Sequence, residues 1–150
     1  MFKKIFWIVV AVLIAIQFIK PAHNEGVIEG PQYISNVVHV PAQIEEIMGR
    51  ACFDCHSNNT VYPWYSNIQP VAWFLANHVN EGKEHLNFSE FASYPAKKQK
   101  HKLEEVTEAM QEGWMPLNSY TWMHAEAKLS QEERDAITSW AKESMAMINE

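Results

Sequence analysis

The only two cysteines of the chain lie in the segment Cys52-Phe53-Asp54-Cys55-His56. The pattern C-x-x-C-H is the attachment signature of a c-type haem. On a helical turn, residues i, i+3 and i+4 share one face, so Cys52, Cys55 and His56 are expected to point the same way. The two thiols would bond to the vinyl groups of one haem as thioethers, and His56 would bind the iron as the proximal ligand. The sequence therefore predicts one covalently attached haem c.

Three other interpretations of the two cysteines compete with haem attachment. A thioredoxin-like redox pair should lie beside a strand in a βαβ pattern, and no such pattern flanks Cys52. A zinc site would need a fourth ligand, and His39, the nearest upstream candidate, is unpaired. A disulfide between Cys52 and Cys55 would be strained and would close a very small loop. Haem attachment is the interpretation that the motif favours.

An electron-transfer cytochrome fills both axial positions of the iron, so a second ligand is expected far from His56. Met115 is the first candidate, because Pro116 follows it and keeps it on a loop between two predicted helices. Its alternative role is packing. His78 is the second candidate, since it is expected on the apolar face of a helix, where it could also remain a hydrogen-bonded core residue. A methionine ligand paired with a histidine ligand raises the reduction potential of the iron relative to two histidine ligands. An open sixth position would instead permit gas or peroxide chemistry.

Helices are predicted on both sides of the cysteine motif. Pro41 can open a helix that carries apolar residues at helical spacing into the motif. Pro70 starts the next helix, and Gly82 is expected to end it. The residues expected on the inner face of this second helix are Val71, Phe74, Leu75, His78 and Val79. Residues 58–69, between the two helices, should form an irregular loop over the haem edge.

Two further helices are predicted in the C-terminal half. One covers Ala96–Glu112 and ends at Gly113. The last starts after Ser130, which can form a capping box with Glu133. The chain shows no strand alternation and no internal repeat, so the predicted fold is all-α, a cytochrome c-like domain around one haem. The five tryptophans outside the N-terminal segment are expected to wall the haem pocket or, more simply, to pack in the core.

An apolar run at the N-terminus, Ile5–Ile19, follows Lys3 and Lys4. Its length as a helix is roughly 22 Å, short of a ~30 Å hydrocarbon core unless flanking lysines extend it. Small residues of a cleavage site do not follow the run, so residues 1–20 are predicted to be a signal anchor or transmembrane helix. This places the haem domain on the periplasmic side of the inner membrane. A soluble periplasmic protein after signal cleavage is the alternative.

Composition divides the remaining chain into a linker and a domain. Residues 21–40 contain glycine, proline and few large apolar side chains, so they are predicted to be a linker on which Tyr33 and Ile34 dock against the domain. Residues 41–150 form the predicted haem-binding domain. The net charge of −6, from 18 acidic and 12 basic residues, argues against nucleic-acid binding.

Several segments together resemble a known family, the small bacterial haem-binding domain proteins that carry one c-type haem. They are Cys52-Phe53-Asp54-Cys55-His56-Ser57-Asn58-Asn59-Thr60, Tyr62-Pro63-Trp64-Tyr65, the helix from Pro70, Asn87-Phe88-Ser89, and Met115-Pro116 with Tyr120, His124, Leu129 and Trp140. The resemblance implies haem binding by Cys52, Cys55 and His56, an exported location and a mostly helical fold. It runs from about Tyr33 to the C-terminus, and the combined motifs are more specific than C-x-x-C-H alone.

The predicted function is that of a monohaem electron carrier attached to the membrane through its N-terminal helix and serving a redox partner that the sequence does not identify. Catalysis is not required for this role, so an enzyme is the less favoured class. The alternative is a peroxidase-like enzyme or a gas or redox sensor whose sixth ligand is open or displaceable, with His78 or His124 as a distal acid or base. A haem-free zinc or interaction module is the third possibility.

Overall fold

The computed structural model describes residues 1–149, and in this part of the chain the only regular secondary structure is helical. The sole β feature described is an isolated bridge between Glu25 and Asn59. The seven α-helices are α1 (Phe2–Ile16), α2 (Ala42–Ala51), α3 (Phe53–His56), α4 (Val71–His85), α5 (Ala96–Glu112), α6 (Asn118–Thr121) and α7 (Gln131–Met147). Short 3₁₀ turns are η1 (Ile34–Asn36), η2 (Trp64–Asn67), η3 (Phe88–Ser93) and η4 (Ala125–Ala127). The all-α prediction is confirmed.

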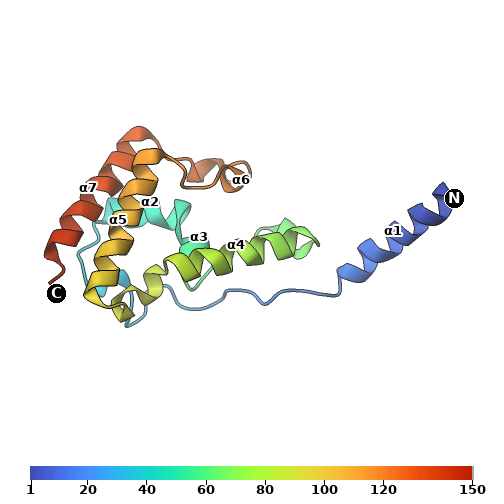
Figure 1. The fold of residues 1–150 in the computed structure, drawn as a ribbon, viewed down its shortest axis with the longest axis horizontal. Helices are drawn as coiled ribbons and strands as arrows, with labels where there is room; N and C mark the ends of the chain where they lie inside the picture. The colour runs from blue at the N-terminus through green and yellow to red at the C-terminus, as the bar shows by residue number, and fades with distance from the viewer. Residues whose placement is uncertain (150) are drawn as a thin grey trace.

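The helices α5 and α7 pack side by side and form one side of the domain, with α2 against α7 (Figure 1). Both helices have the ends that the sequence predicts. Gly113 ends α5 with φ +72°, in the left-handed region that glycine adopts at least cost. Ser130 and Glu133 form the predicted capping box at the start of α7. Their shared core includes the buried side chains of Leu103, Met110, Ile137, Trp140 and Ala141.

The helix α4 differs from its prediction in length and in the face that it buries. It continues through Gly82 to His85, so Gly82 is not a stop. A side chain at Gly82 would lie 2.5 Å from the carbonyl oxygen of Cys55, so glycine here permits the close approach of α4 to α3. Ala72 and Val79 are buried, while Val71 and Phe74 are exposed. The predicted inner face is therefore wrong at Val71, whereas Phe74 is exposed on the wall of a cavity that Leu75, His78 and Val79 also line.

The tryptophans also differ from the expectation of core packing. Only Trp140 is buried, whereas Trp64, Trp73, Trp114 and Trp122 are exposed. Trp140 donates its indole hydrogen to the carbonyl of His39, 3.0 Å away, and so ties α7 to the segment before α2. Four large aromatic side chains are thus available at the surface or at the edge of a cavity.

The N-terminal helix α1 projects from one end of the domain (Figure 1). It has 15 residues, and none of them is buried. Among the described residues, no helix combines the length and apolar character needed to cross a membrane. The prediction of a transmembrane helix at residues 1–20 is corrected accordingly, because 15 residues at about 1.5 Å each reach only about 22 Å.

The segment predicted as a linker lies along the domain. Tyr33 and Ile34 are buried, as expected. Closer to α1, the Asn24 side chain donates hydrogen bonds to Ser57 and Thr60, at 3.0 Å each, and accepts one from Lys83 at 2.6 Å. The first half of the segment is thus bonded to the loop that follows α3 and to α4.

Candidate functional site

A cavity of about 580 Å³ lies between the cysteine motif, α4, α5 and the segment that follows α5. This volume falls within the range of roughly 300–1,000 Å³ found for ligand and cofactor sites. Its walls are mainly apolar and include Val79, Phe88, Val106, Met110, Leu117, Ile137 and Trp140. No lysine or arginine is among the described residues that line it. The cavity therefore suits a large, mostly apolar ligand.

The cysteine motif occupies the junction between α2 and α3. Cys52 ends α2 and precedes α3 with φ −127° and ψ −41°, which interrupts the helix at this residue. The amides of Cys55 and His56 nonetheless donate to the Cys52 carbonyl, at 3.2 and 2.9 Å. One helical turn is thereby kept between the two cysteines. Cys52, Cys55 and His56 all line the cavity, as their spacing predicts.

His56 is held by a backbone carbonyl. Its Nδ1 lies 2.9 Å from the carbonyl oxygen of Leu86, and because a carbonyl only accepts, Nδ1 carries the hydrogen. Burial lowers the pKa of His56 below its ordinary value, against a smaller raising effect of the backbone hydrogen bonds. The imidazole is therefore neutral at pH 7. Its Nε2 keeps a lone pair, which is the form that binds a metal.

The two cysteine thiols are free and half-buried. Burial raises the pKa of Cys52 to about 12 and that of Cys55 to about 11. Both side chains are thus protonated at neutral pH in the haem-free chain. Thiol redox chemistry depends on the thiolate, so the structure disfavours the thioredoxin-like interpretation.

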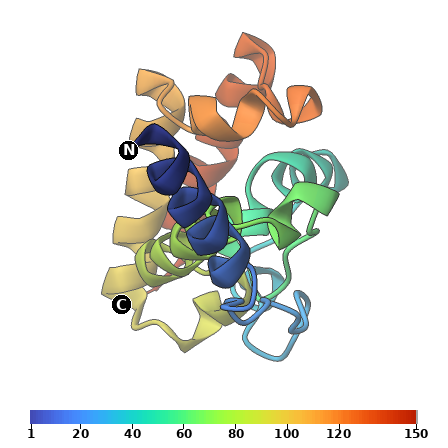
Figure 2. The same cartoon turned by 90° about the vertical axis from the view of Figure 1, so that its right-hand side faces the viewer.

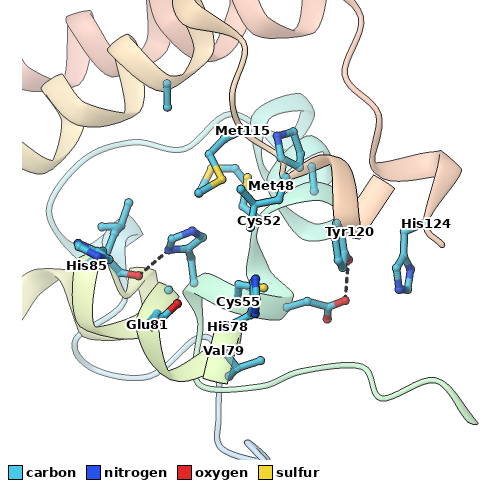
Figure 3. Close-up of a pocket in the computed structure, with 18 of the residues that line it drawn as sticks. Met48, Cys52, Cys55, His78, Val79, Glu81, His85, Met115, Tyr120 and His124 are labelled. Atoms are coloured by element: carbon cyan, nitrogen blue, oxygen red, sulfur yellow. Dashed lines mark hydrogen bonds between the residues drawn. The ribbon is translucent and has the colours of Figure 1, made fainter. Parts of the chain in front are cut away.

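The two predicted candidates for the sixth ligand come from different walls of the cavity. Met115 comes from the segment between α5 and α6, and His78 comes from α4 (Figure 3). The Met115 backbone is fixed by Arg134, whose guanidinium donates to its carbonyl at 2.7 Å. His78 Nδ1 donates to the carbonyl of Phe74 at 2.9 Å, within its own helix. Both side chains line the cavity.

A polar cluster connects the cysteine motif to the segment around α6. The hydroxyl of Tyr120 donates to Asp54 at 2.7 Å, and the other oxygen of that carboxylate accepts from the amide of Val61 at 2.8 Å. Burial, followed by the Asp54 contact, raises the pKa of Tyr120. His124 stacks on Tyr120 and shares a 2.9 Å hydrogen bond with the Tyr65 hydroxyl. These contacts hold the chain after Met115 against the motif.

The contact between Asp54 and Tyr120 and the role of the Leu86 carbonyl were not predictable from the sequence. Asp54 occupies one of the two variable positions of C-x-x-C-H, and no spacing rule connects it to Tyr120, which follows 66 residues later. The Leu86 carbonyl is a backbone atom and leaves no signal in side-chain chemistry. His85, which the sequence did not single out as a site residue, is exposed and also lines the cavity.

A zinc site is not formed here. Within residues 1–149, no group of three or more His, Cys, Asp or Glu side chains is arranged to hold a metal ion. The donors that line the cavity include the two thiols, the imidazoles of His56 and His78, and the Met115 thioether.

Comparison with known proteins gives one match. A family model described as a haem-binding domain matches residues 11–143, which is most of the chain. No curated protein and no solved structure matches.

Proposed function

The chain belongs to the haem-binding domain family, and on that premise we propose that it carries one covalently attached haem c and transfers electrons outside the inner membrane. The observation that supports this proposal is the convergence of Cys52, Cys55, His56 and Met115 on one apolar cavity of about 580 Å³. Catalysis would need a substrate site beside the iron, whereas electron transfer needs only the bound cofactor and an accessible edge.

The residues of the cavity fit a haem. Two thiols one helical turn apart can each add across a vinyl group, so that a C–S bond forms and the thiol hydrogen passes to the neighbouring vinyl carbon. The apolar walls match the porphyrin faces and exclude water.

When bound, haem supplies an iron that takes up and releases one electron. His56 would provide the proximal ligand through Nε2, because the Leu86 carbonyl holds Nδ1 and fixes the plane of the ring. Met115, whose carbonyl accepts a hydrogen bond from Arg134, would provide the sixth ligand. This ligand pair favours a higher reduction potential than two histidines would.

A second candidate function remains supported by His78 and His124, which also line the cavity. If Met115 does not bind the iron, either imidazole could act as an acid or base toward a small molecule at an open position. The protein would then be a peroxidase-like enzyme or a sensor.

We place the haem domain on the extracytoplasmic side of the inner membrane, attached to the bilayer through α1. Lys3 and Lys4 precede α1, and apolar side chains are exposed along the length of the helix. Covalent haem attachment supports the same side of the membrane. A protein released by cleavage after the apolar segment is the alternative.

Visible and near-infrared spectra of the haem-loaded protein in both oxidation states test the proposed function. We expect low-spin spectra that carbon monoxide does not change, together with a methionine-to-iron charge-transfer band at the red edge of the ferric spectrum. Met115→Ala should abolish this band, and His78→Ala, the control, should leave it. A high-spin spectrum of the native protein that changes with carbon monoxide or peroxide would contradict the electron-carrier proposal and favour the enzyme or sensor.

A further inference from the structure

We propose that the domain itself contacts the lipid bilayer through an apolar patch on η2 and the start of α4. The patch consists of Trp64, Ile68, Val71, Trp73 and Phe74. The patch contacts the surface of a bilayer that contains anionic lipids. The inference deepens the proposed function, because it rests on the attachment of α1 to the membrane and adds a second, independent contact.

The patch is unusual for its size and its lack of charge. Its five large apolar side chains are all exposed, from 37% for Trp73 to 76% for Trp64, within one turn of 3₁₀ helix and the adjoining turn of α4. Residues 61–80 contain no Asp, Glu, Lys or Arg, although one fifth of the whole chain is charged. Contiguous exposed apolar surface of this kind marks a contact with a protein or a membrane.

Hydrogen bonds place the patch directly beside the C-terminal end of α1. The Gln17 side chain accepts from the Gln69 amide at 2.9 Å and donates to the Gln69 carbonyl at 3.2 Å. The carbonyl of Ile19 accepts from the Gln69 side chain at 2.8 Å and from the Trp73 indole at 3.0 Å. Gln69, which makes three of these four bonds, is buried. The junction therefore fixes α4 at the end of α1.

The continuity of α1 with the patch indicates a bilayer as the occupant. Residues 5–19 carry no charge either, and their apolar side chains are exposed along α1 and beyond it. Figure 2 looks at this end of the domain, with α1 nearest the viewer. Lys3, Lys4 and Lys20 flank the apolar run, and the cationic ends complement anionic headgroups. Tryptophan is the side chain preferred at the membrane–water boundary.

The same placement puts the cavity beside the membrane. Phe74 belongs both to the patch and to the cavity wall, and Val61, Pro63 and Tyr65 of the uncharged segment also line the cavity. A membrane contact at the patch would hold this edge of the haem site close to the bilayer surface. Its electron partner would then be a molecule held in or on the same membrane.

Vesicle flotation of the full-length, haem-loaded protein tests the contact. Vesicles of phosphatidylcholine and phosphatidylglycerol are mixed with the native protein or with the double variant Ile68→Glu, Val71→Glu, and the bound fraction is measured on a gel. We expect the partition coefficient to fall at least about tenfold, since two apolar contacts are lost and charge is added. The control Ala146→Glu, Met147→Glu adds the same charge to exposed positions at the opposite end of the domain and should change binding by less than about threefold.

Trp64→Glu repeats the test outside α4, at the most exposed residue of the patch, and should also weaken binding. Equal losses in the patch and control variants would overturn the proposal, because the effect would then be general repulsion. The proposal would also be overturned if the patch variants bind vesicles as well as the native protein does while Leu13→Glu loses vesicle binding. In that case α1 would be the only contact with the membrane. A third contradicting result is that the native protein self-associates in the absence of vesicles while the patch variants do not. That result would assign the patch to contact with a second copy of the chain and would overturn the membrane proposal. A haem-loaded protein whose native form fails to bind vesicles would contradict the membrane attachment itself, without affecting the haem assignment.

Discussion

His56 receives its orientation from the carbonyl oxygen of Leu86, a neutral acceptor at 2.9 Å. A carboxylate in this place would pull the Nδ1 hydrogen more strongly and make the imidazole a more basic ligand. A carbonyl exerts a weaker effect, so His56, if it binds the iron as proposed, would remain close to an ordinary neutral imidazole. Together with the proposed methionine ligand, this arrangement would favour the reduced state of the iron and hence a higher potential.

The cysteine thiols give a pH dependence that can be measured in the haem-free chain. Their pKa values of about 12 and 11, raised by burial above the ordinary 9.0, mean that the folded state prefers the protonated thiols. This preference contributes fully to stability below about pH 9 and is lost as the pH rises toward 11–12. The free energy of unfolding of the haem-free native chain should therefore fall relative to that of Cys52→Ala, Cys55→Ala between about pH 9 and 12.

Thiolate absorbance in the ultraviolet supplies the direct check on the same sample. Titration midpoints well above 9 in the folded chain, returning to ordinary values in denaturant, are the expected result. Midpoints at or below 9 in the folded chain would contradict the burial of the two thiols.

Side-chain type and spacing indicated four residues that the structure places on one cavity, and their role in haem binding stays a prediction. Cys52, Cys55 and His56 follow from a spacing that has few other uses, and Met115 follows from its place before a proline. The Leu86 carbonyl and the bond from Tyr120 to Asp54 could not be predicted in this way. Both depend on the tertiary approach of segments that are 30 and 66 residues apart.

Among the elements, α4 depends most on a single small residue. Gly82 lies against the carbonyl of Cys55, and this contact sets the distance between α4 and α3, the helix that carries Cys55. From the sequence, Gly82 was expected to end the helix, because glycine commonly lies at helix C-termini. Its actual role is to allow close packing, which only the tertiary structure reveals.

Gly82→Ala should lower the free energy of unfolding by about 1–3 kcal/mol, because the new methyl group meets backbone that cannot yield without moving α3. Gly49→Ala is the matched control, since Gly49 lies inside α2 with no atom within 4 Å of the added carbon. This control should gain about 0.5–1 kcal/mol from the higher helix propensity of alanine. Chemical denaturation of the haem-loaded proteins measures both, and similar effects of the two substitutions would refute the close approach.

The ends of the longer helices were predictable, whereas the face that α4 buries was not. Gly113 and the Ser130 capping box are local signals, and they hold in the structure at the predicted residues. The apolar periodicity of α4 indicated a core face, but Val71 is exposed at the surface and Phe74 is exposed on the cavity wall. Apolar periodicity shows that a helix has an apolar face, but it does not show whether that face packs against protein or against another phase. The short turns η1 to η4 and the four-residue helix α6 carry too few residues for such signals.

In the whole molecule, negative charge surrounds the site. The net charge is −6, and the charged residues other than histidine that line the cavity are Asp54, Glu81, Glu105 and Glu108. Figure 3 shows Glu81 on the α4 side of the cavity. Acidic groups around an electron-transfer site attract cationic partners and repel anionic ones, and salt screens both effects.

A cationic small-molecule oxidant should therefore react faster with the reduced haem protein than an anionic oxidant of equal driving force, by about tenfold or more at low ionic strength. Stopped-flow absorbance measures both rates, and their ratio should approach one as salt is added. Glu81→Gln with Glu108→Gln should reduce the preference, whereas Glu143→Gln, on α7 outside the cavity, should not. A preference for the anionic oxidant would show that the exposed haem edge lies under positive charge instead.

The central claim is that one haem is held covalently by Cys52 and Cys55 in the cavity between α3, α4, α5 and the Met115 segment. Intact-mass measurement of the denatured protein, produced in a host that can attach c-type haem, tests it most directly. We predict the mass of the mature chain plus one haem, and the mass of the chain alone for Cys52→Ala, Cys55→Ala. A native protein that loses its haem on denaturation, or a double variant that retains it, would contradict the claim.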